Sequence, residues 1–373
     1  MSLQPHERLI LLCARTRLDD ALRERICAAV EQPLCWPTFV AQAKEQELTP
    51  LMYLNLKRAA AALVPPETLS HLRALTQRTL IRNALLSEEL FALIKLFKRE
   101  GIAFIPLKGI LLAEAVYGDM SLRPIRDLDV MVRSEDLPRV TSLLAQQGFS
   151  CRSADPEKES RSPTKHDLAF TKSRSAVKVL LELHWKLKDR VYRLPEEMIW
   201  NHRVAYAWRG ETVMILSPEM TLLHLVHHLN ANAYSLKVLV DVAETLRAYQ
   251  EELDWDQLEA LAARCGMMRN LVVALECANA VLGAPVPIKA RQMAPALVRE
   301  RRWLCALVRD PRWYFSRRAQ LIQRHGNVRN LFSALFVDGT PSQLWQAVRS
   351  VGRDISLTGL VRSGLRMLAP PST

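Results

Sequence analysis

The sequence lacks the long hydrophobic run that a membrane-spanning helix requires, because none of its apolar stretches approaches roughly 18 residues. The short run LILLCA at 9–14 is flanked by charge and has no cleavage-like site, so we do not expect a signal peptide. The seven cysteines stand singly and form no CxxC pair. This pattern excludes a disulfide scaffold and a zinc ribbon, and it favours the reducing environment of the cytoplasm.

Several common catalytic and nucleotide-binding signatures are absent as well. The chain has no GxGxxG sequence, no Walker sequence, and no evident grouping of Ser, His and Asp or of Cys and His for nucleophilic catalysis. With 49% hydrophobic and 24% charged residues, the chain has the composition of an ordinary globular protein. Its 373 residues suffice for two or three domains.

Positive charge is concentrated near the C-terminus. Residues 289–373 contain 15 Lys and Arg against 4 Asp and Glu, so this segment carries 11 of the 12 net positive charges. Aromatic residues are interspersed among them. The basic tail fits a contact with a polyanion such as RNA or with an anionic membrane surface. It fits equally a solvated helical face on which arginine stems cover aromatic side chains, which is the commoner case.

Hydrophobic periodicity predicts helices before residue 100 and a mixture of strands and helices after it. Apolar residues recur at spacings of three and four up to a long helix at 67–100, which Gly101 ends. Alternating or short apolar runs then predict strands at 102–107, 127–133, 167–172 and 177–185, and a hairpin at 203–208 and 211–216. The pattern also predicts short helices at 110–117 and 135–147, the second with Ser134 as N-cap, and a polar loop at 152–165.

The remainder of the chain is predicted to be helical, with helices at 218–250, 255–264, 267–282 and 290–309. The predicted fold class is therefore α+β, with a small mixed-sheet core flanked by N- and C-terminal helical regions. The predicted regions are a helical N-terminal region at 1–100, the α/β core at 101–216, a helical region at 217–288 and a basic helical C-terminal region at 289–373.

Two carboxylates stand one residue apart in an otherwise apolar strand. Asp127 and Asp129 occupy positions i and i+2 of DLDVMV, so they project from the same face with Cα atoms roughly 6.5–7 Å apart. Burial of unpaired charge is costly, and a divalent cation would neutralise both groups. Mg²⁺ prefers oxygen ligands and often binds phosphates as well. Glu182, which lies amid the apolar run VLLELHW, is the candidate for a third ligand.

A lysine and a glycine end the preceding strand. Gly109 allows the backbone to approach a ligand closely, and the amides of the following helix are suited to an anion. Lys108 is a second candidate for contact with a phosphate group. Arg123 and Arg126, just before Asp127, offer bidentate phosphate contacts. The sequence thus places four candidate anion-binding residues ahead of the acidic pair.

These motifs together resemble the bacterial nucleotidyltransferases of the DNA-polymerase-β-like superfamily. The resemblance includes Lys-Gly and a short helix, then RxxRDLDVMV, then a strand that ends in ELHW. It extends to LTPLMYLNL before the core and to LLHLVHHL and LVDVAETL behind it, or roughly residues 30–260. It implies a nucleotidyltransferase core in which Asp127 and Asp129 are the metal-binding pair. Glu182 corresponds to the third carboxylate and Gly109 to the phosphate-loop glycine.

The resemblance implies Mg²⁺-dependent (or Mn²⁺-dependent) transfer of a nucleoside monophosphate from a nucleoside triphosphate to a hydroxyl group. The acceptor, whether protein, RNA, sugar or small molecule, stays open. Ile110 follows the glycine where the superfamily usually has Ser or Gly. This departure supports an alternative, a degenerate core that binds a nucleotide or a partner without catalysis. A third interpretation is an adaptor for RNA or a membrane surface that acts through the basic tail.

Histidines supply the remaining candidates. His184 lies two residues after Glu182 and shares its face, which suggests a contact with substrate or with a metal ligand. His224, His227 and His228 share one side of a predicted helix. They fit a metal site or, more simply, histidines that line the cleft or hydrogen-bond Asp241. No Glu accompanies them in a zincin arrangement, and this favours the simpler interpretation.

Overall fold

The computed structural model describes residues 2–160, 162, 165–174, 177–188, 193–291, 302–324, 329, 332–333 and 336. The chain divides into two compact units, each of which is described by itself. The first contains the described residues of Met1–Glu7, Lys188–Arg193 and Leu222–Thr373, and the second those of Arg8–Leu187 and Leu194–Thr221. Much of the basic tail at 289–373 lies outside the described residues, so its predicted contact with a polyanion stays a prediction.

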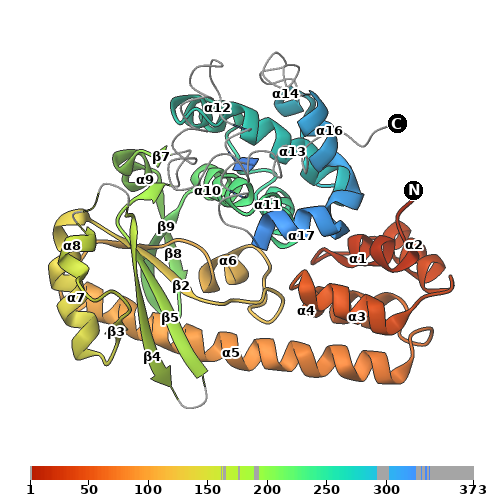
Figure 1. Ribbon diagram of the computed structural model, residues 1–373, viewed down its shortest axis with the longest axis horizontal. Helices are drawn as coiled ribbons and strands as arrows, with labels where there is room; N and C mark the ends of the chain where they lie inside the picture. Colours follow the sequence, from red (N-terminus) through yellow and green to blue (C-terminus); the bar gives the residue numbers. More distant parts are fainter. Residues whose placement is uncertain are drawn as a thin grey trace, which may run out of the picture. The chain divides into compact units, whose positions relative to one another are not determined.

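The elements up to the sheet follow the predicted order (Figure 1). The first helices are α1 (Pro5–Cys13), α2 (Asp20–Val30), α3 (Trp36–Glu45), α4 (Thr49–Ala59) and α5 (Pro66–Arg99). They are followed by β1 (Phe104–Pro106), α6 (Ile110–Ala115), β2 (Leu128–Val132), the 3₁₀ helix η1 (Ser134–Asp136), α7 (Leu137–Gln146) and β3 (Ser150–Cys151). Next come α8 (Pro156–Ser160), β4 (Asp167–Arg174), β5 (Val177–His184), β6 (Leu187–Lys188) and β7 (Arg193–Leu194).

The later elements are mainly helical. They are α9 (Glu196–Asn201), β8 (Arg203–Trp208), β9 (Glu211–Leu216), α10 (Pro218–Ala231), α11 (Leu236–Ala248), α12 (Trp255–Arg264) and α13 (Met268–Leu282). The last described elements are α14 (Ile288–Arg291), α16 (Arg302–Arg309), η2 (Pro311–Phe315) and α17 (Arg317–Arg324). None of the helices in the described ranges combines the length and the apolar character needed to cross a membrane.

A five-stranded mixed sheet in the order β1-β2-β5-β4-β3 forms the centre of the second unit. β2 and β5 are parallel, whereas the other neighbours in this sheet are antiparallel. One face of the sheet is apolar, because Val130, Leu181 and Leu183 all point into a core formed with α5 and α7. Figure 1 shows α5 passing across the strands of the sheet. The α+β class with a small mixed sheet and flanking helices is thus confirmed.

Several predicted boundaries are wrong for local reasons. The predicted helix at 218–250 is two helices, because Ala233 and Tyr234 adopt left-handed backbone conformations between α10 and α11. Ser134 is not an N-cap but the first residue of η1, a 3₁₀ turn before α7. The predicted loop at 152–165 contains α8. Of the predicted helix at 290–309, residues 292–301 lie outside the described residues.

The long helix α5 holds the loop that leads to the acidic motif. The buried Asn83 side chain donates hydrogen bonds to the carbonyl oxygens of Met120 at 2.6 Å and Arg123 at 2.9 Å. One residue earlier, Arg82 donates to the carbonyl oxygens of Ile125 at 2.9 Å and Arg126 at 2.7 Å. Four carbonyl groups of this loop, which has no strand partner there, thus accept hydrogen bonds from side chains of one helix. The entry of the chain into β2 is fixed from outside the sheet.

We expect Asn83→Ala to lower the free energy of unfolding by ~1–3 kcal/mol, because it leaves two carbonyl groups without their buried donor. Denaturant unfolding measures this change. Thr79→Ala on the same helix is the matched control, since the hydrogen bond of the Thr79 hydroxyl in the described part of the chain is to the carbonyl of Leu75, within α5. Equal and small losses in both variants would show that α5 does not anchor the loop.

Candidate active site

The register of two parallel strands brings the predicted carboxylates together. Asp129 of β2 lies directly beside Glu182 of β5, and Met131 lies beside His184. Because neighbours in register point to the same face, Asp129, Glu182 and His184 share the sheet face opposite the apolar core. Leu181 and Leu183, which alternate with them, are fully buried in that core. The strand alternation read from ELHW thus places polar groups on one face.

Asp129 is the centre of the cluster. Its side chain is only 2% exposed, and each carboxylate oxygen faces a basic group. Lys108 Nζ lies 3.2 Å from Asp129 Oδ2, and His184 Nε2 lies 3.2 Å from Asp129 Oδ1. The same His184 nitrogen is 3.7 Å from Glu182 Oε2. The buried charge is therefore neutralised from two sides by side chains of the protein.

The pKa values follow from this arrangement. Burial would raise the pKa of Asp129, but Lys108 and His184 outweigh it and hold this pKa well below its usual range. Burial would lower the pKa of His184, yet its hydrogen bonds to Asp129 and Glu182 raise that pKa to about 9. Burial also acts to lower the pKa of Lys108, which Asp129 and Asp127 nevertheless raise. Lys108 and His184 are therefore cations at neutral pH.

Local backbone contacts deliver Lys108 to this position. The amide of Leu107 donates to the carbonyl of Asp129 at 3.0 Å, so the chain leaves β1 beside the buried carboxylate. Gly109 then turns the chain into α6 with φ 73° and ψ −122°, a conformation that L side chains rarely adopt. A Cβ on Gly109 would lie 3.7 Å from the carbonyl oxygen of Asp127, which is ordinary contact, so the backbone angle is what requires glycine.

The other predicted phosphate-binding and metal-binding residues lie around the cluster. Asp127 precedes β2, is partly exposed and acts on the charge of Lys108, as does the buried Arg123. Arg126 is mostly exposed and pairs with Glu47, with contacts of 2.6 Å and 3.1 Å. Asp127, Arg123 and Lys108 thus belong to one electrostatic neighbourhood, whereas Arg126 is bound to the helical N-terminal segment.

The residues present fit a divalent cation. Asp129, Glu182 and His184 each offer a ligand atom, and these atoms all lie within 4.8 Å of one another. Asp129 Oδ2 is buried, and its contact with a described side chain is the ion pair with Lys108. Carboxylate oxygens suit Mg²⁺ and Mn²⁺, and the imidazole extends the choice to other transition metals. Asp127, predicted as a ligand, lies outside this group of three.

Two residues that the sequence did not single out lie beside the cluster. Asp167 of β4 is in register with His184, and its charge helps to raise the pKa of that imidazole. His166 Nε2 lies 3.3 Å from Asp167 Oδ1, and the His166 and His184 rings are 6.4 Å apart. Only the pairing of β4 with β5 creates this proximity. The sole sequence signal was the His-Asp pair at the start of a predicted strand.

The family follows from a comparison with known proteins. Residues 32–283 match the family model described as an uncharacterised nucleotidyltransferase. The chain belongs to this nucleotidyltransferase family. The resemblance drawn from the Lys-Gly and DLDVMV motifs is thus confirmed. No curated protein matches the chain. A crystal structure of an antigenic nucleotidyltransferase-like protein from Paracoccidioides brasiliensis is similar at 15% identity, covering 57% of this chain and 95% of that chain, with a TM-score of 0.32.

Three predicted cleft residues of this nucleotidyltransferase lie in the first unit. His224 and His228 stack on α10 with ring centroids 6.5 Å apart, and Asp241 of α11 is fully buried. Their placement on neighbouring helices agrees with histidines and an aspartate that belong to a helical core. Their role in a cleft with Asp129 stays a prediction, because Asp129 belongs to the second unit.

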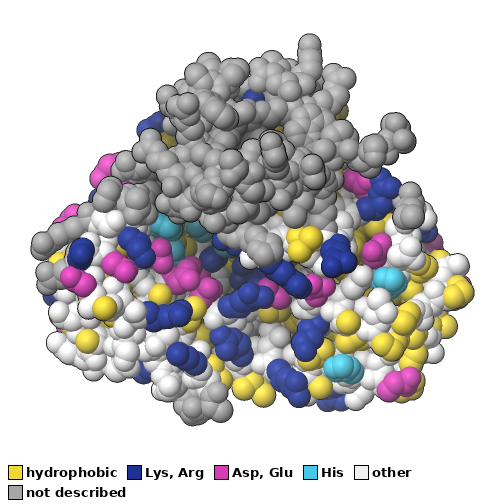
Figure 2. All heavy atoms as spheres, in the orientation of Figure 1, with side chains coloured by type: hydrophobic (Ala, Val, Ile, Leu, Met, Phe, Trp, Pro, Cys, Tyr) yellow, Lys and Arg dark blue, Asp and Glu magenta, His cyan; other side chains and the backbone are white. Residues whose placement is uncertain are grey.

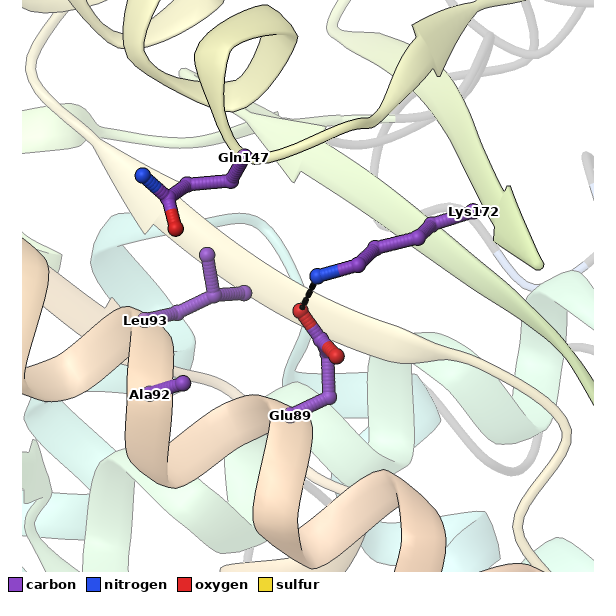
Figure 3. Close-up of a pocket in the computed structure, with 5 residues that line it drawn as sticks. All are labelled: Glu89, Ala92, Leu93, Gln147 and Lys172. Carbon is purple, nitrogen blue, oxygen red and sulfur yellow. Dashed lines mark hydrogen bonds and ion pairs between the residues drawn. The ribbon is translucent and has the colours of Figure 1, made fainter. Parts of the chain in front are cut away.

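A cavity of about 320 Å³ lies elsewhere in the second unit, between α5, the end of α7 and β4. Figure 3 shows the side chains of Glu89 and Lys172 pointing toward each other across it. Their ion pair, at 2.7 Å, neutralises the buried Glu89. Ala169 of β4 lies beside Glu182 and points to the same face of the sheet. Lys172 is three residues further along β4, so its side chain points to the opposite face. This cavity is therefore separate from the acidic cluster.

Opposite charges also meet at the protein surface. Figure 2 shows Asp and Glu side chains gathered beside Lys and Arg side chains near the middle of one face. Such a mixture differs from a uniformly basic stripe, which is the usual footprint of nucleic-acid binding. This one face therefore gives no separate support to a role as an RNA adaptor.

We expect His184 to make the stability of the metal-free protein depend on pH. Its pKa is raised from 6.5 to about 9, so its pairing stabilises the fold fully below pH 6.5. This contribution is lost as the pH rises through about 9. Melting temperatures of the wild type and His184→Gln, measured from pH 6 to 10 with a chelator, should therefore converge toward high pH. A constant difference would contradict a charged His184.

Proposed function

We propose that the protein transfers a nucleoside monophosphate from a nucleoside triphosphate to a hydroxyl group, with Mg²⁺ or Mn²⁺ as the metal. The observation that carries the proposal is the cluster of Asp129, Glu182 and His184 on two paired strands, with Lys108 beside it. The family match supports the class of reaction, and the cluster supports the need for a metal.

Three carboxylates have distinct roles in this proposal. Asp127 and Asp129 hold the metal, and Glu182 accepts the proton of the attacking hydroxyl. Glu182 suits this task because its side chain is 33% exposed, whereas that of Asp129 is 2% exposed. An acceptor from solvent can therefore reach Glu182. A bound divalent metal supplies charge neutralisation and a lower pKa for the acceptor hydroxyl.

Basic groups bind the triphosphate. Lys108, Arg123 and the backbone at Gly109 contact its phosphates, and Arg126 joins them if it exchanges Glu47 for a phosphate oxygen. The acceptor oxygen forms a bond to the α-phosphorus, and the bond from that phosphorus to the bridging oxygen breaks. Pyrophosphate leaves with the bonding electrons, and the proton passes to Glu182. Positioning and charge neutralisation supply most of the rate enhancement.

The direct test is incubation of the protein with each labelled nucleoside triphosphate, Mg²⁺ and cell lysate. A labelled product that requires the metal supports the proposal and reports the class of acceptor. Metal-dependent nucleotide binding with no labelled product under any condition supports the alternative, a core that binds without catalysis. That alternative has support in Ile110, which offers no hydroxyl to a phosphate.

We expect Asp129→Asn to abolish metal-dependent nucleotide binding, because the central ligand loses its charge. Calorimetry with Mg²⁺ and each nucleoside triphosphate measures this loss. Glu135→Gln is the control, since Glu135 is an exposed carboxylate in η1. Unchanged affinity in a folded Asp129→Asn protein would disprove the site assignment.

We expect Glu182→Gln to keep most of the nucleotide affinity and to lose transfer by a factor of about 10²–10⁴, the usual scale of acid–base assistance. The variant is nearly isosteric, and Asp129 keeps its contacts with Lys108 and His184. Nucleotide affinity, turnover and melting temperature should be measured together. Full turnover with a wild-type melting temperature would refute the catalytic role, and a lower melting temperature alone would indicate a structural one.

A further inference from the structure

The metal-free site already contains its own counter-ions. Both oxygens of Asp129 face a cationic side chain 3.2 Å away, Lys108 on one side and His184 on the other. Three carboxylates, Asp127, Asp129 and Glu182, thus lie among the positive charges of Lys108, His184 and Arg123. A metal that binds Asp129 Oδ2 would therefore meet the Lys108 ammonium, whose nitrogen lies 3.2 Å from that oxygen.

We propose that Lys108 is an exchangeable counter-ion that excludes free metal from Asp129 and moves to the triphosphate when metal and nucleotide arrive together. This inference rests on the proposed function and specifies how its metal site is filled. It assigns Lys108 two successive partners, Asp129 in the metal-free protein and a phosphate in the nucleotide complex. The protein would then bind the metal–nucleotide complex in strong preference to the metal alone.

The balance of charge explains this preference. A free divalent cation would add two positive charges beside Lys108, His184 and Arg123, and it would leave the displaced Lys108 ammonium without Asp129. Such a buried or half-buried unpaired charge is costly. A metal–triphosphate complex brings a net negative charge, so the displaced Lys108 ammonium gains a phosphate as soon as it loses Asp129. Only binding of the metal–triphosphate complex leaves the Lys108 ammonium paired.

The geometry allows this exchange without movement of the backbone. Leu107 is fixed to the carbonyl of Asp129, and Gly109 is fixed by the turn into α6. Lys108 lies between these two points on a flexible four-carbon stem. Its side chain is 15% exposed, compared with 2% for that of Asp129, so Lys108 is the less buried member of the pair. Rotation of one side chain is sufficient.

The test compares two ligands on Lys108→Met: Mn²⁺ alone, and Mn²⁺ with the nucleoside triphosphate that the wild type binds most tightly. Removal of the ammonium should strengthen binding of free Mn²⁺ by about tenfold or more, because one competing charge beside Asp129 is gone. The affinity for the Mn²⁺–nucleotide complex should not rise in the same variant, because the phosphate loses the Lys108 ammonium. Titration calorimetry, with Mn²⁺ electron paramagnetic resonance as a second readout, measures both.

Lys98→Met is the matched control. Lys98 also pairs with a carboxylate, that of Glu211, at 2.5 Å on the partly exposed surface of the β8–β9 hairpin. Its removal should leave both affinities unchanged. If Lys108→Met does not fold, Lys108→Gln keeps a polar stem without the charge and carries the same expectations. A gain in melting temperature on addition of Mn²⁺ that exceeds that of the wild type is an independent sign of the opened metal site.

The outcomes separate this inference from the function on which it rests. Unchanged affinity for free Mn²⁺ in the variant would overturn the role of Lys108 as a counter-ion, while the metal site itself stands. An equal rise for Mn²⁺ and for Mn²⁺–nucleotide would overturn its transfer to the phosphate. If neither the wild type nor the variant binds metal or nucleotide, the proposed function and the inference both fail.

Discussion

The structure around the acidic motif depends on one constraint, the burial of the Asp129 carboxylate. A charge that is almost excluded from solvent must be paired, and the fold supplies Lys108 from the end of β1 and His184 from the end of β5. Each of these partners is delivered by a separate strand. The sheet order β1-β2-β5, with β2 in the middle, is what places Asp129 between its two cations.

Other features of the second unit serve the same arrangement. The face of β5 that carries Glu182 and His184 is kept polar because Leu181 and Leu183 alternate into the core under α5 and α7. Asn83 and Arg82 of α5 hold the carbonyl groups of the loop that enters β2. Gly109 permits the sharp turn after Lys108. A site of a few charged groups therefore requires a sheet, a long helix and a strained turn.

The chain belongs to a nucleotidyltransferase family, and its site has a physical feature that the family name does not contain. The carboxylate of Asp129 is already paired with two basic side chains of the chain, Lys108 and His184. In the proposal made above, metal binding at this site is an exchange of partners for Asp129. This view links the stability of the metal-free fold to the order in which substrate and metal enter.

The sequence alone determined the class of fold and the faces of its strands. The alternation in DLDVMV and ELHW assigned Asp129, Glu182 and His184 to polar faces, because successive side chains in a strand point to opposite sides. Periodicity also predicted the hairpin at 203–208 and 211–216 and the long helix before the sheet, since both patterns are local.

Only the tertiary structure decided which faces meet. The register of β2 with β5 made Glu182 and His184 neighbours of Asp129, and the register of β4 added Asp167. The partner of Lys108 likewise depended on the order of the strands. The energy of an ion pair depends on the distance between the two charges in space and not on their spacing along the chain.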